Sequence, residues 1–309
     1  MTISEHVEEF AGLPVRDFDP DEGLTDPAKT AYRLALTYDA AEDGATMGGL
    51  LSRLFDDPAC EKVAALVIGD WNPIENEAGA AEIVASLAAA CDRLPGLRAI
   101  FLGDITYEEC EISWIRQTDI TPILEAYPRL EQLRVRGAEG LSIGEVHHDS
   151  LEALIIESGG LPRSVVRAVA AADLPNLEHV ELWLGSDGYG GDSTVEDLTP
   201  ILSGAAFPRL KYLGLRDCEW ADALATALAD APILRRIETL DLSLGNLGDE
   251  GAVALISGGN LSGLKRLDIH HHYVSDEVID GLKDTGVELN ADQRQESPDD
   301  DDRYIAVSE

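Results

Sequence analysis

The chain has 309 residues and a formal net charge of −36, from 59 acidic and 23 basic residues. Nucleic-acid phosphates and anionic lipids would be repelled by this charge, because binding either one requires a basic patch that releases counterions. We therefore expect neither nucleic acid nor a membrane as partner. The charge either serves solubility or steers a basic protein or peptide towards the chain.

The N-terminal residues, the apolar runs and the cysteines bear on the cellular location of the protein and on whether it binds a cofactor. The first ten residues, MTISEHVEEF, carry three acidic residues where a signal peptide needs a basic start and an apolar run. Apolar runs of the roughly 18 to 20 residues that span a bilayer do not occur. The four cysteines lack Cys-x-x-Cys spacing, and we expect them to be reduced thiols in a cytoplasmic protein. We expect no cofactor.

One apolar phrase, L-x-x-L-x-L, recurs eight times at spacings of 21 to 34 residues. Its anchors are Val63/Leu66/Ile68, Leu97/Ile100/Leu102, Leu130/Leu133/Val135, Leu151/Leu154/Ile156, Leu177/Val180/Leu182, Leu210/Leu213/Leu215, Ile237/Leu240/Leu242 and Leu264/Leu267/Ile269. Recurrence at this period predicts a stacked solenoid. Positions 4 and 6 of the phrase face one side of a strand, and equivalent strands pair in parallel through crossovers on the outer face. The fold class is thus an α/β solenoid.

In chain order, residues 1–62 are expected to form an N-terminal extension and capping unit. Residues 1–30 would pack over the open end of the core, before a strand at 31–36 and a helix at 47–55. Residues 63–290 would hold about eight repeats and a final capping strand at Val287 and Leu289. Residues 291–309, with four consecutive aspartates at 299–302, are expected to be a disordered acidic tail.

The segments between strands predict the crossovers. Helical spacing of apolar residues occurs in 80–94 and in 162–172. Helix starts are expected at Asp192-Ser193-Thr194 and at Ser275. The step of 21 residues from Leu130 to Leu151 is too short for a full helix, so its outer face should be extended or a single turn. Extra residues at 103–118 and 185–192 should form loops on the rim where the strands end.

The segment ETLDLSLGNLGDEGAVAL, residues 238–255, is similar to leucine-rich repeats of the ribonuclease-inhibitor-like type. With ESGGLP, HVELWLG and IHHHY, the whole arrangement resembles a bacterial cytosolic family of leucine-rich repeat proteins to which no activity is attached. The resemblance implies a horseshoe with a parallel concave sheet and convex helices, used mostly to recognise proteins. Position 9, commonly Asn or Cys, conforms only at Cys218, which makes the bend after each strand less regular.

Positions 3, 5 and 7 of each repeat alternate with the core anchors and should line the concave face. In the first two repeats they are small or apolar: Ala65, Val67, Gly69, Ala99, Phe101 and Gly103. Either the N-terminal segment or a rim loop covers this part of the face, or it is an exposed sticky patch.

From the third repeat onwards the same positions become polar and aromatic. We select as candidate binding residues Arg134, Arg136, Glu157, His179, Glu181, Trp183, Tyr212, Arg216, Asp241, Asp268 and His270. Trp, Tyr and Arg dominate binding hot spots, and Trp183, Tyr212 and Arg216 lie on adjacent strands. The alternative is that the arginines only pair with the acidic residues across strands, as a solvated charge lattice of little energetic value.

The rim adds Glu109, Trp114 and Tyr189 as candidates, because loops on a rigid scaffold often carry function. Alternatively, Trp114 and Ile115 are apolar anchors that hold their loop down.

Catalytic chemistry receives weaker support. Asp268, His270 and His272 could offer metal ligands, although the bend at position 9 should separate the two histidines. Ser243, His270 and Asp241 or Asp268 could form a triad, but a Gly-x-Ser-x-Gly turn is lacking. In the loop GSDGYGGDST, Asp187 and Asp192 would repel a phosphate. The sequence therefore favours a non-enzymatic protein-interaction scaffold, with a metal-dependent or hydrolytic enzyme centred on His270 as the alternative.

Overall fold

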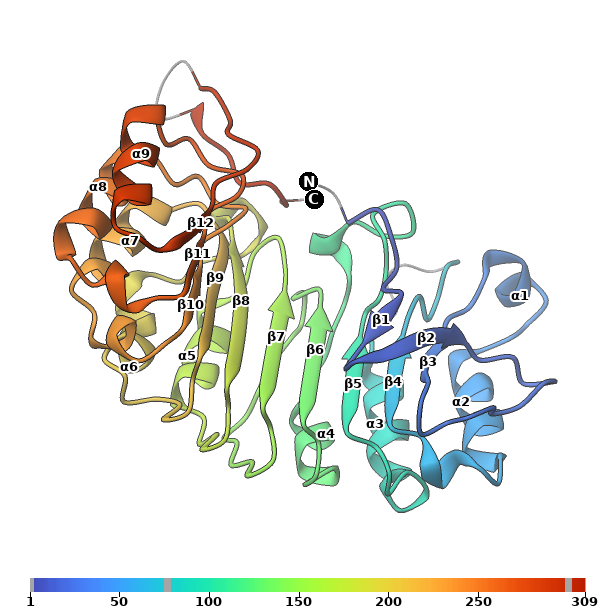
Figure 1. Ribbon diagram of the computed structural model, residues 1–309. Coiled ribbons are helices and arrows are strands. Elements are labelled where there is room, and N and C mark those ends of the chain that lie inside the picture. Colours follow the sequence, from blue (N-terminus) through green and yellow to red (C-terminus); the bar gives the residue numbers. More distant parts are fainter. Residues whose placement is uncertain (1–2, 75–78, 298–301, 309) are drawn as a thin grey trace. The chain divides into compact units, whose positions relative to one another are not determined.

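The structure, a computed structural model, describes residues 3–74, 79–297 and 302–308 (Figure 1). Its contacts divide the chain into two compact units, Ile3–Glu157 and Ser158–Ser308, which we call the N-terminal unit and the C-terminal unit. Each unit is described by itself. Among the described residues, helices long and apolar enough to cross a membrane are absent.

The N-terminal unit is a sheet whose strands follow one another in sequence order. These strands are β1 (Glu9–Phe10), β2 (Leu13–Asp17), β3 (Ala31–Leu34), β4 (Ala65–Ile68), β5 (Ala99–Leu102), β6 (Gln132–Arg136) and β7 (Ala153–Glu157). Its helices are α1 (Tyr38–Glu42), α2 (Met47–Asp56), α3 (Ala81–Ala89) and α4 (Thr121–Ala126). From β2 onwards every neighbouring pair is parallel, whereas β1 pairs with β2 in antiparallel fashion.

The C-terminal unit repeats the same arrangement. Its strands are β8 (His179–Gly185), β9 (Tyr212–Cys218), β10 (Thr239–Asp241), β11 (Arg266–Asp268) and β12 (Glu288–Asn290). Its helices are α5 (Arg163–Ala171), α6 (Thr199–Leu202), α7 (Ala221–Ala229), α8 (Asp249–Gly258) and α9 (Asp276–Asp284). Successive strands from β8 to β12 are parallel and in register, so equivalent repeat positions lie side by side.

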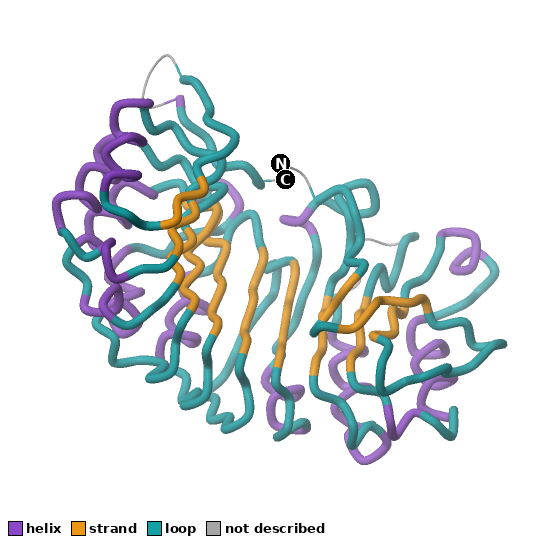
Figure 2. Tube along the Cα trace, in the orientation of Figure 1, coloured by secondary structure: helices purple, strands orange, loops and turns teal. Residues whose placement is uncertain are grey.

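The fold is an α/β leucine-rich repeat solenoid, as the repeated phrase predicts. None of the anchors of the eight repeats is more than 6% exposed, because positions 1, 4 and 6 all point into the core. Within each unit the helices lie on one side of the strands (Figure 2). We call the opposite side of the sheet, which carries positions 3, 5 and 7, the inner face.

The predicted crossovers are confirmed at several points. Helices α2, α3 and α5 occupy the predicted segments, and Thr194 caps a short 3-10 helix with Asp197 in a capping box. The short repeat behaves as its length requires: residues 137–152, all of them described, contain no helix. There His148 is buried, with Nε2 beside the Tyr127 carbonyl and Nδ1 accepting from the Leu151 amide, so it fixes the turn.

The apolar start of the inner face is covered, in agreement with one of the two alternatives. Phe10 packs against Phe101 at a ring-centroid distance of 5.9 Å and joins a buried cluster with Ala65, Val67 and Ala99. Residues up to Asp17 also extend the sheet, because β2 pairs with β3 in parallel. The N-terminal segment therefore covers the face and lengthens the sheet.

The sequence predicted a disordered acidic tail at 291–309. The structure contradicts this prediction for the described residues 291–297 and 302–308, which pack and bond to the rest of the chain. The His271 amide donates to the Asp292 carbonyl and the Gln295 amide donates to the His272 carbonyl. Further on, Ile305 and Val307 are buried. Their apolar side chains outweigh the acidic composition of the segment, while Asp299–Asp301 lie outside the described residues.

Candidate functional site

Equivalent positions align across the inner face of the C-terminal unit. The register places His179, Tyr212, Thr239, Arg266 and Glu288 in one row, which we call the outer row. A second row holds Glu181, Gly214, Asp241, Asp268 and Asn290. In the outer row the side chains are half-buried or exposed, whereas Glu181, Asp241 and Asp268 are buried. Three buried carboxylates therefore lie in the row next to a partly open one.

The first part of this surface is a hydrogen-bonded network around Glu181. Its Oε1 accepts from Arg216 Nη1 and from Trp183 Nε1, each at 2.7 Å. The Tyr212 hydroxyl donates to Asp241 Oδ2 at 2.6 Å, and Arg216 Nε donates to Ser243 Oγ at 2.9 Å. Gly214 makes room for this arrangement, since a Cβ there would lie 3.0 Å from both the Glu181 side chain and the Tyr212 ring.

The network holds its groups in fixed charge states. Burial raises the pKa of Glu181, but the nearby His179, the Arg216 charge and the hydrogen bonds from Trp183 and Arg216 outweigh burial and lower the pKa to about 2. Burial and the neighbouring carboxylates raise the pKa of Tyr212 above its usual range. The phenol is therefore kept as a hydrogen-bond donor, and the carboxylate as an acceptor.

His179 and Tyr212 form the open edge of the network. Their rings stack at a centroid distance of 3.9 Å with 4° between the planes. His179 Nε2 lies 3.6 Å from Glu181 Oε2. The stacked pair presents an aromatic, half-buried surface, held in place through the hydrogen bond of Tyr212 to Asp241.

The second part of the surface is centred on Asp268. Its Oδ1 accepts from His270, with Nδ1 at 2.7 Å, and its Oδ2 accepts from Arg266 Nη2 at 2.9 Å and Asn290 Nδ2 at 2.8 Å. Burial raises the pKa of Asp268, but these hydrogen bonds outweigh it and hold the pKa below its usual range. Asp268 is thus a charged, fully engaged acceptor.

The three consecutive histidines diverge, as the bend after the strand predicts. His270 bonds to Asp268, His271 Nδ1 lies 3.3 Å from the Gly245 carbonyl, and His272 Nε2 lies 3.0 Å from the Ala291 carbonyl. Burial lowers the pKa of both His271 and His272, so both remain neutral at pH 7. Across the described parts of the chain, groups of three or more His, Cys, Asp or Glu side chains placed to hold a metal ion are absent.

The arginines among the candidate residues are paired, as the alternative interpretation proposes, but they are more buried than a solvated lattice implies. In the N-terminal unit, Glu157 is 1% exposed and bridges Arg134 Nε and Arg136 Nε, each at 2.7 Å. Both guanidinium groups also stack over Phe101, with Cζ 4.3 and 5.1 Å from the ring centroid. Arg136 Nη1 also donates to the Ile105 carbonyl at 2.9 Å, which joins this cluster to the rim loop.

Trp183 differs from the exposed anchor expected of a hot spot. It is 7% exposed, and Arg216 lies over its ring at 4.9 Å. Tyr212 remains half-buried, so of this aromatic pair it offers more surface to a partner.

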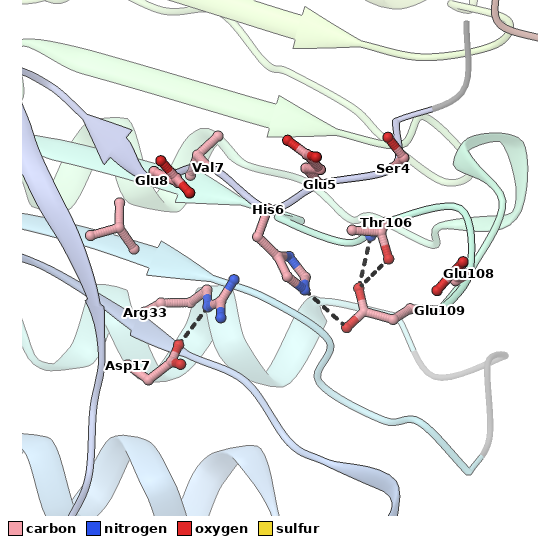
Figure 3. Close-up of a pocket in the computed structure, with 11 residues that line it drawn as sticks. Ser4, Glu5, His6, Val7, Glu8, Asp17, Arg33, Thr106, Glu108 and Glu109 are labelled. Atoms are coloured by element: carbon pink, nitrogen blue, oxygen red, sulfur yellow. Dashed lines mark hydrogen bonds and ion pairs between the residues drawn. The ribbon is translucent and has the colours of Figure 1, made fainter.

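At the rim of the N-terminal unit, Glu109 lies in a pocket of about 730 Å³ (Figure 3). Its Oε2 accepts from the Thr106 amide at 2.8 Å, and its Oε1 lies 3.3 Å from His6 Nε2. Arg33 Nε donates to Asp17 at 2.6 Å on the opposite wall. Glu109 therefore ties the rim loop to the N-terminal segment, and four further acidic residues line the pocket: Glu5, Glu8, Asp17 and Glu108.

The other two rim candidates differ in exposure. Trp114 is 58% exposed, whereas Ile112 and Ile115 beside it are buried and hold the loop down. The anchoring alternative thus applies to Ile115 and not to Trp114. Tyr189 is half-buried in a short 3-10 turn of the Gly-rich loop.

Several residues at these sites were not selected from the sequence. Arg266 and Asn290 complete the surroundings of Asp268, and His6, Arg33 and Asp104 meet at the rim. Arg266 and Asn290 could have been found from their repeat positions. His6 lies outside the repeats, so only the fold brings it to Glu109.

Solved structures include a protein of Bacteroides fragilis, determined by the Northeast Structural Genomics Consortium, that is 33% identical to this chain. The match has a TM-score of 0.81 and covers 89% of this chain and 76% of the other. This chain belongs to the same family. An internalin from Listeria monocytogenes matches the present chain at 12% identity and a TM-score of 0.38, covering 87% of this chain and 75% of the internalin. No family model matches the sequence, and no curated protein is significantly similar to it.

Proposed function

We propose that the protein is a non-enzymatic scaffold that binds a protein or peptide on the inner face of its C-terminal unit. The observation that carries the proposal is the outer row, which is partly open and is held by hydrogen bonds of Tyr212 to the buried Asp241 and of Arg266 to the buried Asp268. Leucine-rich repeat solenoids typically present such surfaces for recognition.

Preorganisation supports binding at this row. Binding loses affinity when side chains must be ordered, so groups already fixed in the free protein cost less entropy. Tyr212 is fixed by Asp241 and by its stack on His179, and Arg266 is fixed by Asp268. Tyr and Arg are also the residue types that contribute most to hot spots.

A basic partner fits the charge of this surface. Among the described residues, the arginines paired with the three carboxylates are Arg216 and Arg266, and the chain as a whole carries a net charge of −36. Association with a basic segment would be accelerated by this field and slowed by salt.

The arrangement favours binding over hydrolysis. The Ser243 hydroxyl accepts a hydrogen bond from Arg216 Nε, and Nδ1 of His270 is engaged with Asp268. The bond between Asp268 and His270 Nδ1 is also found in a Ser-His-Asp triad, but a triad needs Nε2 of the histidine on the serine hydroxyl. Among the described residues His270 makes no hydrogen bond to Ser243, whose hydroxyl is bonded to Arg216 instead.

The test compares two neighbouring cations, each in one ion pair. Arg266 belongs to the outer row, whereas Lys265 pairs with Glu238 and is 72% exposed. Partners captured by the wild-type chain are identified, purified and titrated against Arg266→Ala combined with His179→Ala, and against Lys265→Ala. We expect at least a tenfold loss of affinity for the double variant and less than a twofold change for the control. A partner that binds the double variant as tightly as the wild type would exclude the inner face.

A further inference from the structure

Residues 302–308, which we call the docked segment, belong to the C-terminal unit and form no strand of its sheet, with a bend at residue 306. Side chains alternate along it as on a strand: Ile305 and Val307 are buried, whereas Tyr304 between Arg303 and Ile305 is 71% exposed. The segment therefore presents one side, formed by Arg303, Ile305 and Val307, to the unit.

The segment crosses three successive repeats and bonds to each through its backbone. The Tyr304 amide donates to the Tyr273 hydroxyl at 3.1 Å, after β11. Next, the Ala306 amide donates to the Leu244 carbonyl at 2.7 Å, after β10, and the Val307 amide donates to Asp217 Oδ1 at 3.0 Å, in β9. Contacts to backbone groups fix an extended peptide without requiring its exact sequence.

The docked segment lies against a part of the repeats, the groove, that has an unusual backbone conformation. The residue two positions after the last anchor has positive φ in three consecutive repeats: 52° at Asp217, 67° at Leu244 and 58° at His271. Non-glycine residues seldom adopt this conformation, which costs on the order of 1 kcal/mol and is often kept for a purpose. Two of these three residues, Asp217 and Leu244, accept the hydrogen bonds of the docked segment.

Asp217 gives a second, independent sign of a binding site. Its side chain is 0% exposed, and its Oδ2 lacks a hydrogen-bond partner among the described residues. A buried carboxyl oxygen without a hydrogen-bond partner lowers the stability of the fold, so folding by itself does not account for it. Its other oxygen, Oδ1, binds the docked segment.

The groove begins at an acidic pocket that holds Arg303. This pocket, of about 340 Å³, is lined by Glu219, Asp222, Asp249 and Glu250. Asp222 Oδ1 accepts from the amides of Gly248 and Gly251, at 2.8 and 3.0 Å, and its Oδ2 faces Arg303 Nη1 at 3.1 Å. Asp222 is thus oriented by backbone donors towards a guanidinium, which also lies over the Tyr273 ring at 5.8 Å.

We propose that this groove is a peptide-binding site for an extended segment of a partner protein with the pattern Arg-x-aliphatic-x-aliphatic, and that the chain's own docked segment occupies it as a built-in competitor. The site is distinct from the outer row, so it stands or falls independently of the function proposed there. A tethered competitor acts at a high effective concentration, so a partner peptide must be abundant or better matched to displace it.

The test uses the full chain and a fluorescein-labelled peptide of sequence RYIAVSE, which copies residues 303–309. Arg303→Glu combined with Val307→Asp releases the docked segment and leaves the groove unchanged. By fluorescence anisotropy we expect saturable binding of the peptide to this release variant, and at least tenfold weaker binding to the wild type, whose own segment competes.

Two matched controls locate the binding. In the peptide, the change equivalent to Arg303→Glu should cost at least tenfold in affinity, whereas the change equivalent to Tyr304→Ala should have little effect, because that side chain points outward. In the release variant, Gly248→Ala should weaken binding, since the three atoms nearest to a Cβ built there all belong to the Arg303 guanidinium, which would have to move away from Asp222.

Hydrogen exchange of β9 to β11 checks that each variant is folded. Absence of saturable binding to a folded release variant would overturn the proposal, as would equal binding of the Arg303→Glu peptide. If the release variant does not fold, the wild-type chain gives the answer: excess RYIAVSE should accelerate exchange at the amides of Ala306 and Val307, and unchanged exchange would be equally decisive against the site.

Discussion

Glu157 is expected to be the most costly charged side chain to neutralise in the N-terminal unit. It is 1% exposed and accepts hydrogen bonds from both Arg134 and Arg136. In Glu157→Gln, Arg134 and Arg136 would share one neutral amide oxygen in place of a carboxylate. Arg136, itself 2% exposed, would keep the Ile105 carbonyl at 2.9 Å and Asp104 Oδ1 at 3.7 Å. Removing one partner of a buried pair costs about 3–5 kcal/mol, and here the buried guanidinium groups lose their nearest carboxylate.

Native-state hydrogen exchange measures this loss locally. For the amides of β5 and β6 we expect protection to fall by roughly a hundredfold to a few thousandfold, since about 1.4 kcal/mol corresponds to a factor of ten. The matched control is Glu131→Gln in the same unit, where Glu131 lies 3.5 Å from Arg98 Nε and is 53% exposed. An exposed pair contributes about 0–1 kcal/mol. Equal losses for the two variants would refute the assignment of Glu157 as a buried bridge.

Three further predictions address the rest of the chain. Because the pKa of Glu181 is lowered to about 2, its ionised form stabilises the C-terminal unit above its ordinary pKa. On the order of 3 kcal/mol of unfolding free energy should therefore be lost as the pH falls from about 4.5 towards 2. In urea titrations, the stability difference between the wild type and Glu181→Gln should disappear over that pH range. Phe10→Ala, which empties the contact with Phe101, should cost about 3–5 kcal/mol and expose residues 7–15 to exchange; unchanged protection there would contradict the covering role. Ile115→Ala should cost about 2–5 kcal/mol, whereas Trp114→Ala should change the unfolding free energy by less than about 0.5 kcal/mol in the same denaturation assay.

The repeat architecture could be predicted from the sequence because it is a local and repeated signal. The phrase around Leu213 and Leu215 specifies a strand, and its recurrence 27 residues later at Leu240 and Leu242 specifies the neighbour with which that strand pairs. Each repeat buries its anchors against the next, so the pattern of one repeat determines most of its contacts. The same logic placed Tyr212, Arg216 and Asp241 on one face.

Two features could not be predicted from the sequence: which side chains pair with one another, and where the segments at 3–17 and 302–308 pack. Trp183 follows the alternation of the inner face, yet it is covered by Arg216 because the guanidinium group reaches across to Glu181. The segments at 3–17 and 302–308 lie outside the repeats, so periodicity says nothing about where they pack. Their few apolar residues, Phe10, Ile305 and Val307, determine it instead.

The short hairpin before β3 also bears on how copies of the chain behave towards one another. A parallel sheet offers a row of free amides and carbonyls at its first strand, where another chain could add a strand. Here β1 is two residues long and turns back through Ala11 and Gly12, both with positive φ, onto β2, which contains Pro14. Two-residue turns of this kind twist the hairpin, and proline offers no amide. The hairpin thus makes this edge a poor template for edge-to-edge aggregation.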